Sequence, residues 1–359
     1  MGYIDKIIGR YKSMRSIREL NHIYTQQYAL VGLGNHCVSN LLPVIQYLQL
    51  SLKYICCTSE KKAGLISQKY KGVKGTTSLQ DILNDDTVSG VFVAANPHSH
   101  FHIANEVIKA GKSLFIEKPP CENERELKSL TDTVKLYGSQ HIVVGLQRRF
   151  APATQILQKQ LRIGGERHYH YRYLTGLYPE GDAMLDLFIH PLDYVTFLFG
   201  KAKVKAAEEM RSKDGGQTLF LVLEHQNITG MLELSTDYSW QNPQEQLSIS
   251  TDKGQYILDR MERLDFSPRH SAIWGIPLEK VFQNNATVVN LYGRNDFVPI
   301  VGNNQIVSQG FFSEIQAFAD MVENRCKDNH AFGLESVKHV YSLMAEIKKY
   351  MNIIDDHIL

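Results

Sequence analysis

The sequence lacks the features that assign many proteins to a class at first sight. It holds 39 basic and 38 acidic residues in 359, so it has no excess of positive charge for nucleic acid, and it contains no nucleic-acid-binding motif. It has no uninterrupted apolar run of about 18 residues, and its charged first segment does not resemble a signal peptide. Five cysteines without disulfide or metal-ligand spacing are typical of reduced thiols. These absences favour a cytoplasmic protein that acts on a small molecule, with no nucleic-acid partner and no stable membrane insertion.

The hydrophobic pattern divides the chain into an arm and two domains. From 27 to 148, β-branched runs such as "QYALVGLG" and "VSGVFVAAN" alternate with helical segments, which predicts an α/β domain with a doubly wound parallel sheet of the Rossmann type. From 149 to 359, strands in series and two closing helices predict an α+β domain with a mostly antiparallel, open sheet. Residues 262–308 have no clear pattern, and we expect them to shape a pocket.

Residues 1–26 form a separate basic arm. Apolar residues recur there at helical spacing, with basic residues largely between them, which predicts an amphipathic helix. Such a helix can lie on an anionic membrane, but docking on the body of the protein or on a partner subunit is the favoured interpretation. The apolar positions are Ile4, Ile7, Ile8, Tyr11, Met14 and Ile17.

The first predicted strand ends in "VGLGNHC", which places Gly32 and Gly34 in the first two positions of a GxGxxG turn and Cys37 in the third. The first glycine permits the tight turn, and the second lets a pyrophosphate approach the backbone. The phosphates then rest on the start of the next helix, at Asn35 and His36. This placement predicts dinucleotide binding. Because Cys37 is larger than glycine or alanine, we expect it to displace the helix slightly.

The second predicted strand ends in "CCTSEKK", which lacks the carboxylate that binds the ribose 2′-hydroxyl of NAD. Thr58, Ser59 and Lys62, with Lys61 nearby, offer hydroxyl and ammonium donors to a 2′-phosphate, so the pattern favours NADP(H) over NAD(H). In the alternative interpretation, the lysines are only a solvated helix start and Glu60 turns back to the ribose.

Two further segments carry candidate catalytic groups. "FIEKPP" places Glu117 and Lys118 at the C-terminal end of a strand, where open α/β sheets bind ligands. "MLDLFIHPLDYV" is an apolar helix in which Asp186, His190 and Asp193 share one face. That face either lines a pocket or forms a satisfied buried network in which Asp186 accepts from His190.

In order and spacing, "GLGNHC", "NPHSH", "AGKSLFIEKPP", "GLQRRFAP" and "GDAMLDLFIHPLDYVTFLFG" resemble the Gfo/Idh/MocA family of glucose-fructose oxidoreductase, inositol dehydrogenase and their relatives. The resemblance extends to the final helices. It implies hydride transfer between NAD(P) and a hydroxyl or keto carbon of a sugar, nucleotide-sugar or cyclitol. Two alternatives remain open: a non-catalytic NAD(P)-binding regulatory protein, and a glycosidase that uses nicotinamide for transient oxidation.

The resemblance also implies roles for individual residues. His190 would be the general acid and base, because the unperturbed pKa of histidine lies near working pH. Lys118 would stabilise the developing alkoxide, and Asp186 would orient the imidazole. Substrate contacts would come from Lys118, His190, Arg149 and Asp193. Beside the nicotinamide, the expected cofactor contacts are Asn96, Pro97, His100, Glu117 and Lys118, and no metal site is expected from the histidines of "NPHSHFH".

The strand "RHYHYRY" alternates tyrosines with basic side chains, and one of its faces is a candidate oligomer interface. Family members commonly pair through the second-domain sheet, so the resemblance implies a homodimer or homotetramer. The expected partners are therefore a small polyhydroxylated substrate and further copies of the chain.

Overall fold

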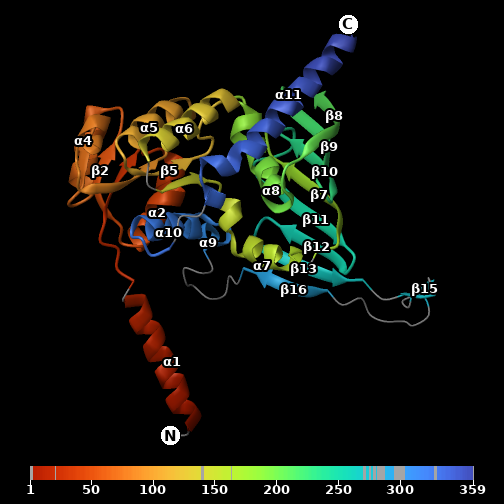
Figure 1. Cartoon of the computed structure of the whole chain (residues 1–359), viewed down its shortest axis with the longest axis horizontal. Helices are drawn as coiled ribbons and strands as arrows, with labels where there is room; N and C mark the ends of the chain where they lie inside the picture. The colour runs from red at the N-terminus through yellow and green to blue at the C-terminus, as the bar shows by residue number, and fades with distance from the viewer. Residues whose placement is uncertain are drawn as a thin grey trace.

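The computed structural model describes residues 3–20, 22–138, 141–162, 164–269, 272–274, 276–277, 280, 288–294, 304–326 and 330–358. Two large sheets stand side by side, with helices between and around them (Figure 1). The helix α1 (Tyr3–Leu20) and the C-terminal end of α11 (Lys338–Ile358) extend from this body in different directions (Figure 1). None of the described helices combines the length and apolar character needed to cross a membrane.

The first sheet is parallel throughout and has the strand order β3-β2-β1-β4-β5-β6. The chain order reverses between β1 and β4, so the sheet has a topological switch point at the carboxyl end of β1. This confirms the predicted Rossmann-type domain. The strands are β1 (Gln27–Val31), β2 (Ser51–Cys56), β3 (Lys74–Thr76), β4 (Val88–Val93), β5 (Ser113–Glu117) and β6 (Ile142–Gly145).

Helices cover both faces of this sheet. The helix after β1 starts with a π-helical turn, η1 (Cys37–Leu41). Pro43 lacks a backbone N–H, and in a regular α-helix its ring clashes with the carbonyl four residues earlier, so the wider turn relieves that clash. That the size of Cys37 displaces the helix from the strand stays a prediction. The helices are α2 (Leu42–Tyr47), α3 (Glu60–Lys69), α4 (Leu79–Leu83), α5 (Pro97–Lys109) and α6 (Glu124–Tyr137).

A helix from near the end of the chain completes the first domain. α10 (Phe311–Val322) packs against α2, β4, β5 and β6. It lies on the same face of the sheet as α2, which is only six residues long. Phe318 of α10 joins Tyr28, Phe92 and Phe115 in one buried aromatic cluster. The predicted boundary at residue 149 therefore separates the two sheets, but α10 belongs by packing to the first domain, because a parallel sheet needs cover on both faces.

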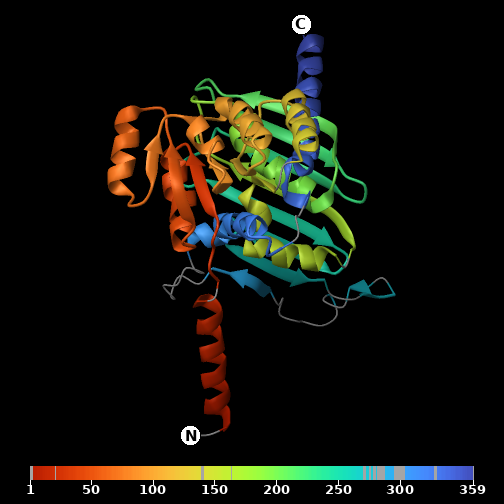
Figure 2. The same cartoon turned by 60° about the vertical axis from the view of Figure 1, so that its left-hand side comes forward.

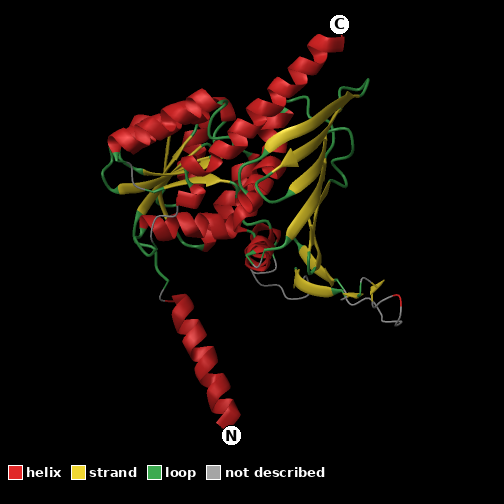
Figure 3. Cartoon of the chain, turned by 45° about the vertical axis from the view of Figure 1, so that its right-hand side comes forward, coloured by secondary structure: helices red, strands yellow, loops and turns green. Residues whose placement is uncertain are grey.

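The second sheet has the order β16-β13-β12-β11-β7-β10-β9-β8, and all its pairs are antiparallel except β7–β10. Helices lie on one of its faces and leave the other uncovered (Figure 3). This confirms the predicted open sheet. Its strands are β7 (Glu166–Leu174), β8 (Lys203–Arg211), β9 (Gln217–Glu224), β10 (Thr229–Ser235), β11 (Gln244–Thr251), β12 (Gly254–Asp259), β13 (Arg263–Pro268) and β16 (Val289–Gly293). The helical segments are η2 (Gln147–Phe150), α7 (Pro152–Leu161), η3 (Met184–Phe188), α8 (Ile189–Phe199), η6 (His330–Phe332) and η7 (Leu334–Val337).

Much of the region 262–308 lies outside the described residues. Of its described parts, β13 and β16 extend the edge of the second sheet, and the hairpin β14 (Ala272–Ile273) and β15 (Ile276–Pro277) projects from the body (Figure 1). The short α9 (Gln305–Ser308) leads into α10. That this region shapes a pocket remains a prediction.

The arm forms the expected helix but does not dock on the body. α1 points away from both sheets (Figure 2), and its side chains from residue 4 to 14 are all exposed. Docking on the body is therefore wrong, and the partner-subunit and membrane interpretations remain predictions. The chain after α1 is held on α10, where Tyr24 donates to Asp320 at 3.0 Å.

Candidate active site

The turn after β1 has the geometry of a dinucleotide-binding loop. Gly32 has a φ of 91°, and a Cβ on it would lie 2.5 Å from the carbonyl oxygen of Ala94. Its N–H donates to the carbonyl of Cys56 at 2.9 Å. Gly34, in contrast, has open space where a Cβ would be. The fold therefore requires the first glycine, and the second leaves the backbone open to a phosphate.

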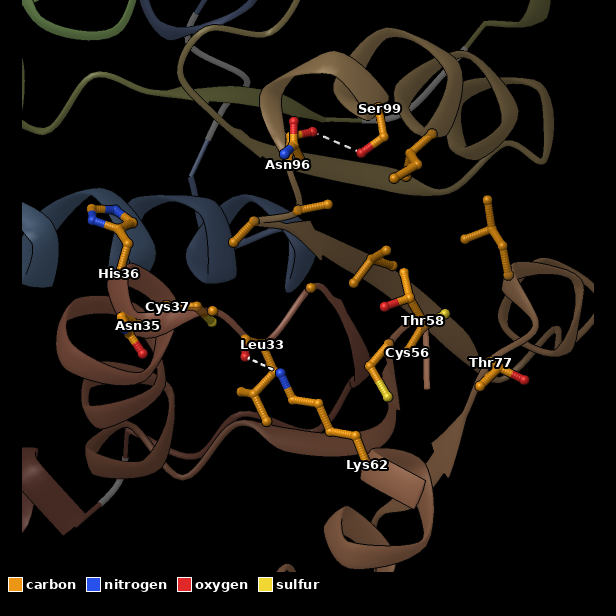
Figure 4. Close-up of a pocket in the computed structure, with 18 residues that line it drawn as sticks. Leu33, Asn35, His36, Cys37, Cys56, Thr58, Lys62, Thr77, Asn96 and Ser99 are labelled. Atoms are coloured by element: carbon orange, nitrogen blue, oxygen red, sulfur yellow. Dashed lines mark hydrogen bonds between the residues drawn. The ribbon is translucent and has the colours of Figure 1, made fainter. Parts of the chain in front are cut away.

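A pocket of about 590 Å³ opens above this turn, at the switch point of the sheet (Figure 4). Ligand sites typically measure about 300 to 1000 Å³. Its walls come from the segments that follow β1, β2 and β4, which is where this fold holds a dinucleotide. The predicted cofactor contacts that line it are Gly32, Gly34, Asn35, His36, Thr58, Lys62 and Asn96.

At the end of β2, a positively charged and a negatively charged side chain border the pocket. Lys62 reaches over the turn, and its Nζ donates to the carbonyl oxygen of Leu33 at 2.6 Å (Figure 4). The carboxylate of Glu60 accepts a hydrogen bond from the hydroxyl of Thr77, another residue of the pocket wall. Ser59 does not line the pocket; instead its side chain caps α3.

His100 is also placed differently from its prediction. It is buried, and its ring nitrogens lie 2.8 Å from the carbonyl oxygen of Pro119 and 3.0 Å from that of Ala95. Burial lowers its pKa. His100 therefore links the turn after β4 to the turn that carries Lys118. Pro97 is the first residue of α5 and does not line the pocket. Among the described residues, no group of three potential ligands could hold a metal ion.

Lys118 connects the two domains. It follows β5, and its Nζ donates to the backbone carbonyl oxygen of Asp186 in η3 at 2.6 Å. Burial lowers the pKa of Lys118, and the carboxylates of Glu117 and Asp186 act in the opposite direction. An ammonium has three donors, so two remain for a ligand.

His190 is 8% exposed and lies in the first turn of α8. Burial lowers its pKa well below the ordinary range, and the positive charges of Arg148, Lys118 and His36 lower it further. The acid and base role rested on the unperturbed pKa of histidine; the lowered pKa of His190 favours the neutral imidazole, which is the form that accepts a proton.

Asp186 does not orient His190 by a hydrogen bond in the described part of the chain. Its carboxylate accepts from the hydroxyl of Tyr178 at 3.2 Å. The expected hydrogen bond between Asp186 and His190, four residues apart, does not form because Met184–Phe188 is π-helical. A π turn places residues five apart, rather than four apart, above one another. Tyr178 lies in a segment without a regular pattern, so the sequence offered no signal for it.

Arg149 and Asp193 form a buried ion pair instead of contacting a substrate. Both are 2% exposed, and Arg149 Nε donates to Asp193 at 2.8 Å. Arg149 Nη1 donates to the side chain of Ser336 at 2.7 Å. The predicted substrate role of both residues is therefore not supported, because each satisfies the other inside the protein.

Arg148 faces the site in their place. It makes two hydrogen bonds with Glu245 of β11, at 2.6 and 2.8 Å, and Tyr171 donates to the same carboxylate at 2.6 Å. Its Nη1 is buried without a hydrogen-bond partner in the described part of the chain. Arg148 thus offers an unused donor near His190, while Glu245 neutralises its charge. The strand pattern around Glu245 gave no sign of this role.

The parallel sheet, the glycine turn at its switch point and the pocket above it define a dinucleotide-binding protein in which a second domain adds His190 beside Lys118. Residues 26–145 match the model of the oxidoreductase family with an NAD-binding Rossmann fold, Gfo/Idh/MocA. The inositol 2-dehydrogenase of Acidothermus cellulolyticus is 25% identical over 185 residues, which are 49% of this chain and 53% of that protein. The chain thus spans about half the length of this relative.

Solved structures share the whole fold. A dehydrogenase from Chromobacterium violaceum matches with a TM-score of 0.77 at 16% identity, covering 93% of this chain and 99% of that one. A 3-ketoreductase from Actinomadura kijaniata, solved with TDP-benzene and NADP, matches at 0.71 and 15% identity, covering 90% and 96%. An oxidoreductase from Agrobacterium radiobacter, solved with NAD+, L-tartaric acid and magnesium, matches at 0.73 and 16% identity, covering 90% and 96%. At these identities the likeness concerns the fold alone.

Proposed function

We propose that this protein is an NAD(P)-dependent oxidoreductase that transfers a hydride between nicotinamide and a hydroxyl or keto carbon of a polyhydroxylated substrate. The observation that carries the proposal is the hydrogen bond by which Lys118 reaches η3, the turn that leads into His190, in a chain that also has the glycine turn and pocket of a dinucleotide site. The match of the first domain to the family model supports the same conclusion.

His190 and Lys118 would act on the same substrate oxygen in different ways. In the oxidation direction, the neutral imidazole of His190 accepts the hydroxyl proton, which contributes about 10² to 10⁴ in rate in enzymes of this kind. The Lys118 ammonium donates a hydrogen bond to the same oxygen as it gains alkoxide character. When bound, the nicotinamide accepts or returns the hydride. In the reduction direction, the proton returns from His190 to the oxygen.

The other polar groups of the site suit a neutral, hydroxyl-rich substrate. The free Nη1 of Arg148 can donate to a hydroxyl, and the carboxylate of Asp186 can accept from one. Because Glu245 already pairs with Arg148, this arginine adds little net charge to attract a carboxylate or a phosphate. The names of the inositol 2-dehydrogenase and the 3-ketoreductase support a cyclitol, sugar or nucleotide-sugar.

NADP(H) is our preferred cofactor. Lys62 and Thr58 are pocket donors near the end of β2, and no carboxylate follows directly on that strand. Glu60 is turned toward Thr77, which removes it from the direct path to the ribose. The solved structures with NADP and with NAD+ show that this fold accepts both, so the choice depends on these side chains.

A fluorescence titration tests the cofactor proposal. Binding of NADPH and NADH would be measured for the wild type, Lys62→Ala and Lys61→Ala. We expect tighter binding of NADPH, weakened about tenfold or more by Lys62→Ala through loss of a charge-assisted contact. Lys61→Ala is the matched control, because Lys61 is exposed and does not line the pocket. Equal binding of both nucleotides in all three proteins would reject the preference.

The reaction is tested by incubating the protein with NADP+ and a panel of cyclitols and sugars while following nicotinamide reduction. Net reduction that His190→Ala abolishes supports the oxidoreductase. Cleavage of an aryl glycoside without net reduction would identify the glycosidase alternative, because such an enzyme returns its cofactor unchanged. Binding without either reaction would identify a regulatory protein.

We further propose that the protein is a cytoplasmic homo-oligomer that pairs through the uncovered face of the second sheet. Phe220 and Met231 are exposed there on neighbouring strands, beside the exposed His170 of β7. Cys37, Cys56, Cys57 and Cys121 are buried thiols outside any disulfide, which supports a reducing compartment. Light scattering should give a multiple of the chain mass, and Met231→Glu should reduce it; a monomeric wild type would reject the pairing.

A further inference from the structure

Trp240 is an exposed aromatic residue that the proposed reaction does not use. It lies in the segment between β10 and β11 and is 51% exposed, although tryptophan is on average a well-buried residue. Its indole is nevertheless held in place, because Nε1 donates to the backbone carbonyl oxygen of Leu177 at 2.8 Å. The indole also packs against Gly176, where a Cβ would lie 2.4 Å from its Cδ1 atom. An exposed aromatic ring that is already fixed in place is a preformed surface for a ligand.

Two further exposed apolar side chains lie on the same two segments. Leu177 is 43% exposed and Tyr238 is 49% exposed. The backbone N–H of Tyr238 donates to the carbonyl oxygen of Thr175 at 2.8 Å, which ties the segment after β10 to the segment after β7 a second time. The side-chain amide of Gln244 donates to the hydroxyl of Tyr238 at 2.9 Å. We call Leu177, Tyr238 and Trp240 the apolar rim.

The apolar rim lies at the edge of the second sheet that carries the candidate active site. Leu174 at the end of β7 is paired with Ser235 at the end of β10 and with Gln244 at the start of β11. The two rim segments therefore leave the sheet side by side. Glu245, the next residue of β11, is the carboxylate that binds Arg148. The rim thus starts beside the arginine that offers a donor to the substrate.

One side chain separates the apolar rim from Asp186. Tyr178 follows Leu177 in the chain, and its hydroxyl donates to the carboxylate of Asp186 at 3.2 Å. The backbone carbonyl oxygen of Asp186 accepts from Lys118 at 2.6 Å. When the reacting ring of a substrate contacts Lys118 and Asp186, a group that extends from this ring past Tyr178 meets Trp240.

We propose that the apolar rim is a binding subsite for a second sugar ring, so that the substrate is a neutral glycoside of at least two rings. This inference rests on the proposed function and narrows its substrate class. One face of a pyranose consists of C–H groups and stacks on an aromatic ring, while its hydroxyls need polar partners at the edge of the site. Ser239, Gln241 and Asn242 supply such neutral groups next to Trp240.

The charge of the rim segment favours a neutral glycoside over a nucleotide-sugar. Residues 238–244 read YSWQNPQ and contain no charged side chain. The diphosphate of a nucleotide-sugar is usually bound by arginine or lysine, and this segment provides neither. A second sugar ring, in contrast, needs only the aromatic surface and the amide and hydroxyl groups that are present.

Tryptophan fluorescence tests the subsite without turnover. The chain has two tryptophans, and the other one, Trp274, lies on the hairpin of β14 and β15 and is 97% exposed. In a Trp274→Phe protein the emission therefore reports Trp240 alone. This protein, with NADP+ present, would be titrated with maltose, cellobiose, lactose and melibiose, and separately with glucose and myo-inositol. We expect at least one disaccharide to change the emission at a concentration about tenfold lower than either single-ring compound requires.

Three variants show whether the aromatic surface itself binds the second ring, with affinities measured by calorimetry. Trp240→Ala should weaken binding of that disaccharide by about tenfold and change binding of the single-ring compounds by less than about twofold. Gly176→Ala keeps the indole but forces it to move, and it should weaken the disaccharide in the same way. Trp274→Ala removes the other exposed tryptophan and is the matched control, which should bind like the wild type.

Four results would overturn the subsite. The first is an emission of Trp240 that no disaccharide changes, and the second is an equal loss of disaccharide and single-ring binding in Trp240→Ala. A response to UDP-glucose without a response to any disaccharide would assign the rim to a nucleotide-sugar. An emission that shifts when the protein alone is diluted would assign it to a contact between copies of the chain.

A failure of this subsite is distinguishable from a failure of the proposed reaction. Disaccharide binding that Trp240→Ala weakens, without any nicotinamide reduction, would support the subsite and reject the oxidoreductase. Reduction of nicotinamide by a single-ring compound, with no disaccharide response from Trp240, would support the oxidoreductase and reject the subsite.

Discussion

The ammonium of Lys118 and the backbone carbonyl of Asp186 are joined by a hydrogen bond of 2.6 Å that crosses from the first domain to the second. The lysine belongs to the turn after β5, and the carbonyl belongs to the π-helical turn that precedes His190. This contact therefore ties the candidate oxyanion stabiliser to the segment that leads into the candidate proton carrier.

Replacing Lys118 should separate catalysis from cofactor binding. We expect Lys118→Ala to lower kcat by about 10² to 10³, because an electrostatic donor to the developing alkoxide is lost. The affinity for NADPH should change less than about threefold, since Lys118 does not line the dinucleotide pocket. Lys118→Arg should not restore the rate, because the two side chains differ in shape. Steady-state kinetics and a nucleotide titration on the same preparations check this prediction. A parallel loss of kcat and of NADPH affinity would contradict it.

The lowered pKa of His190 predicts a loss of stability in acid. The unfolded chain binds the proton more tightly, so this contribution is complete above the ordinary histidine pKa of about 6.5 and is lost as the pH falls below it, by about 1.4 kcal/mol per pH unit. Compared with His190→Asn, the wild type should therefore lose stability on acidification. Urea unfolding between about pH 5 and 8 measures the difference. His339→Asn, at an exposed position on α11, is the control and should run parallel to the wild type.

The ion pair of Arg149 and Asp193 should matter for folding rather than for substrate choice. Asp193→Ala leaves a buried guanidinium without its partner, and we expect the free energy of unfolding to fall by about 3 to 5 kcal/mol. Removing Glu224 from its exposed pair with Lys205 should change it by at most about 1 kcal/mol. Denaturant titrations give both values. A folded Asp193→Ala protein of unchanged stability but altered substrate preference would reinstate the substrate role.

The two glycines of the first turn should respond differently to the same methyl group. Gly32→Ala forces a Cβ against the Ala94 carbonyl at a φ of 91°, and should destabilise the fold by about 2 kcal/mol or more. Gly34→Ala meets no protein atom and should melt like the wild type, yet lose NADPH affinity, because the methyl group occupies the phosphate's approach. Thermal melts and nucleotide titrations check the contrast. Normal NADPH binding by Gly34→Ala would argue against the phosphate position.

The sequence predicted those parts of the fold that depend on local pattern. Alternating β and α runs identified the parallel sheet, and strands in series identified the second one. The glycine spacing located the turn, because Gly32 and Gly34 act through their own backbone. Lys118 contacts the turn that leads into His190, while the catalytic roles that the family resemblance implied for both residues stay a prediction.

The predictions that failed concern contacts between residues, which the helical periodicity of one segment cannot show. Asp186 and His190 share an arc on an ideal helix, but the real segment changes from a π to an α helix between them. Asp193, three residues after His190 in α8, pairs with Arg149. Likewise, the pattern of α10 showed an apolar face without showing which sheet it would cover. Such choices depend on tertiary packing between segments far apart in the chain.

The position of α10 has a consequence for biosynthesis. A ribosome finishes all six strands of the first sheet by residue 145, but the helix that covers one face of that sheet begins only at Phe311. The aromatic cluster around Phe92 and Phe115 therefore stays without Phe318 while more than a hundred further residues are made. Nascent first domains expose this apolar face to chaperones and to one another until α10 has been made, so a segment far along the chain determines when the first sheet can be covered.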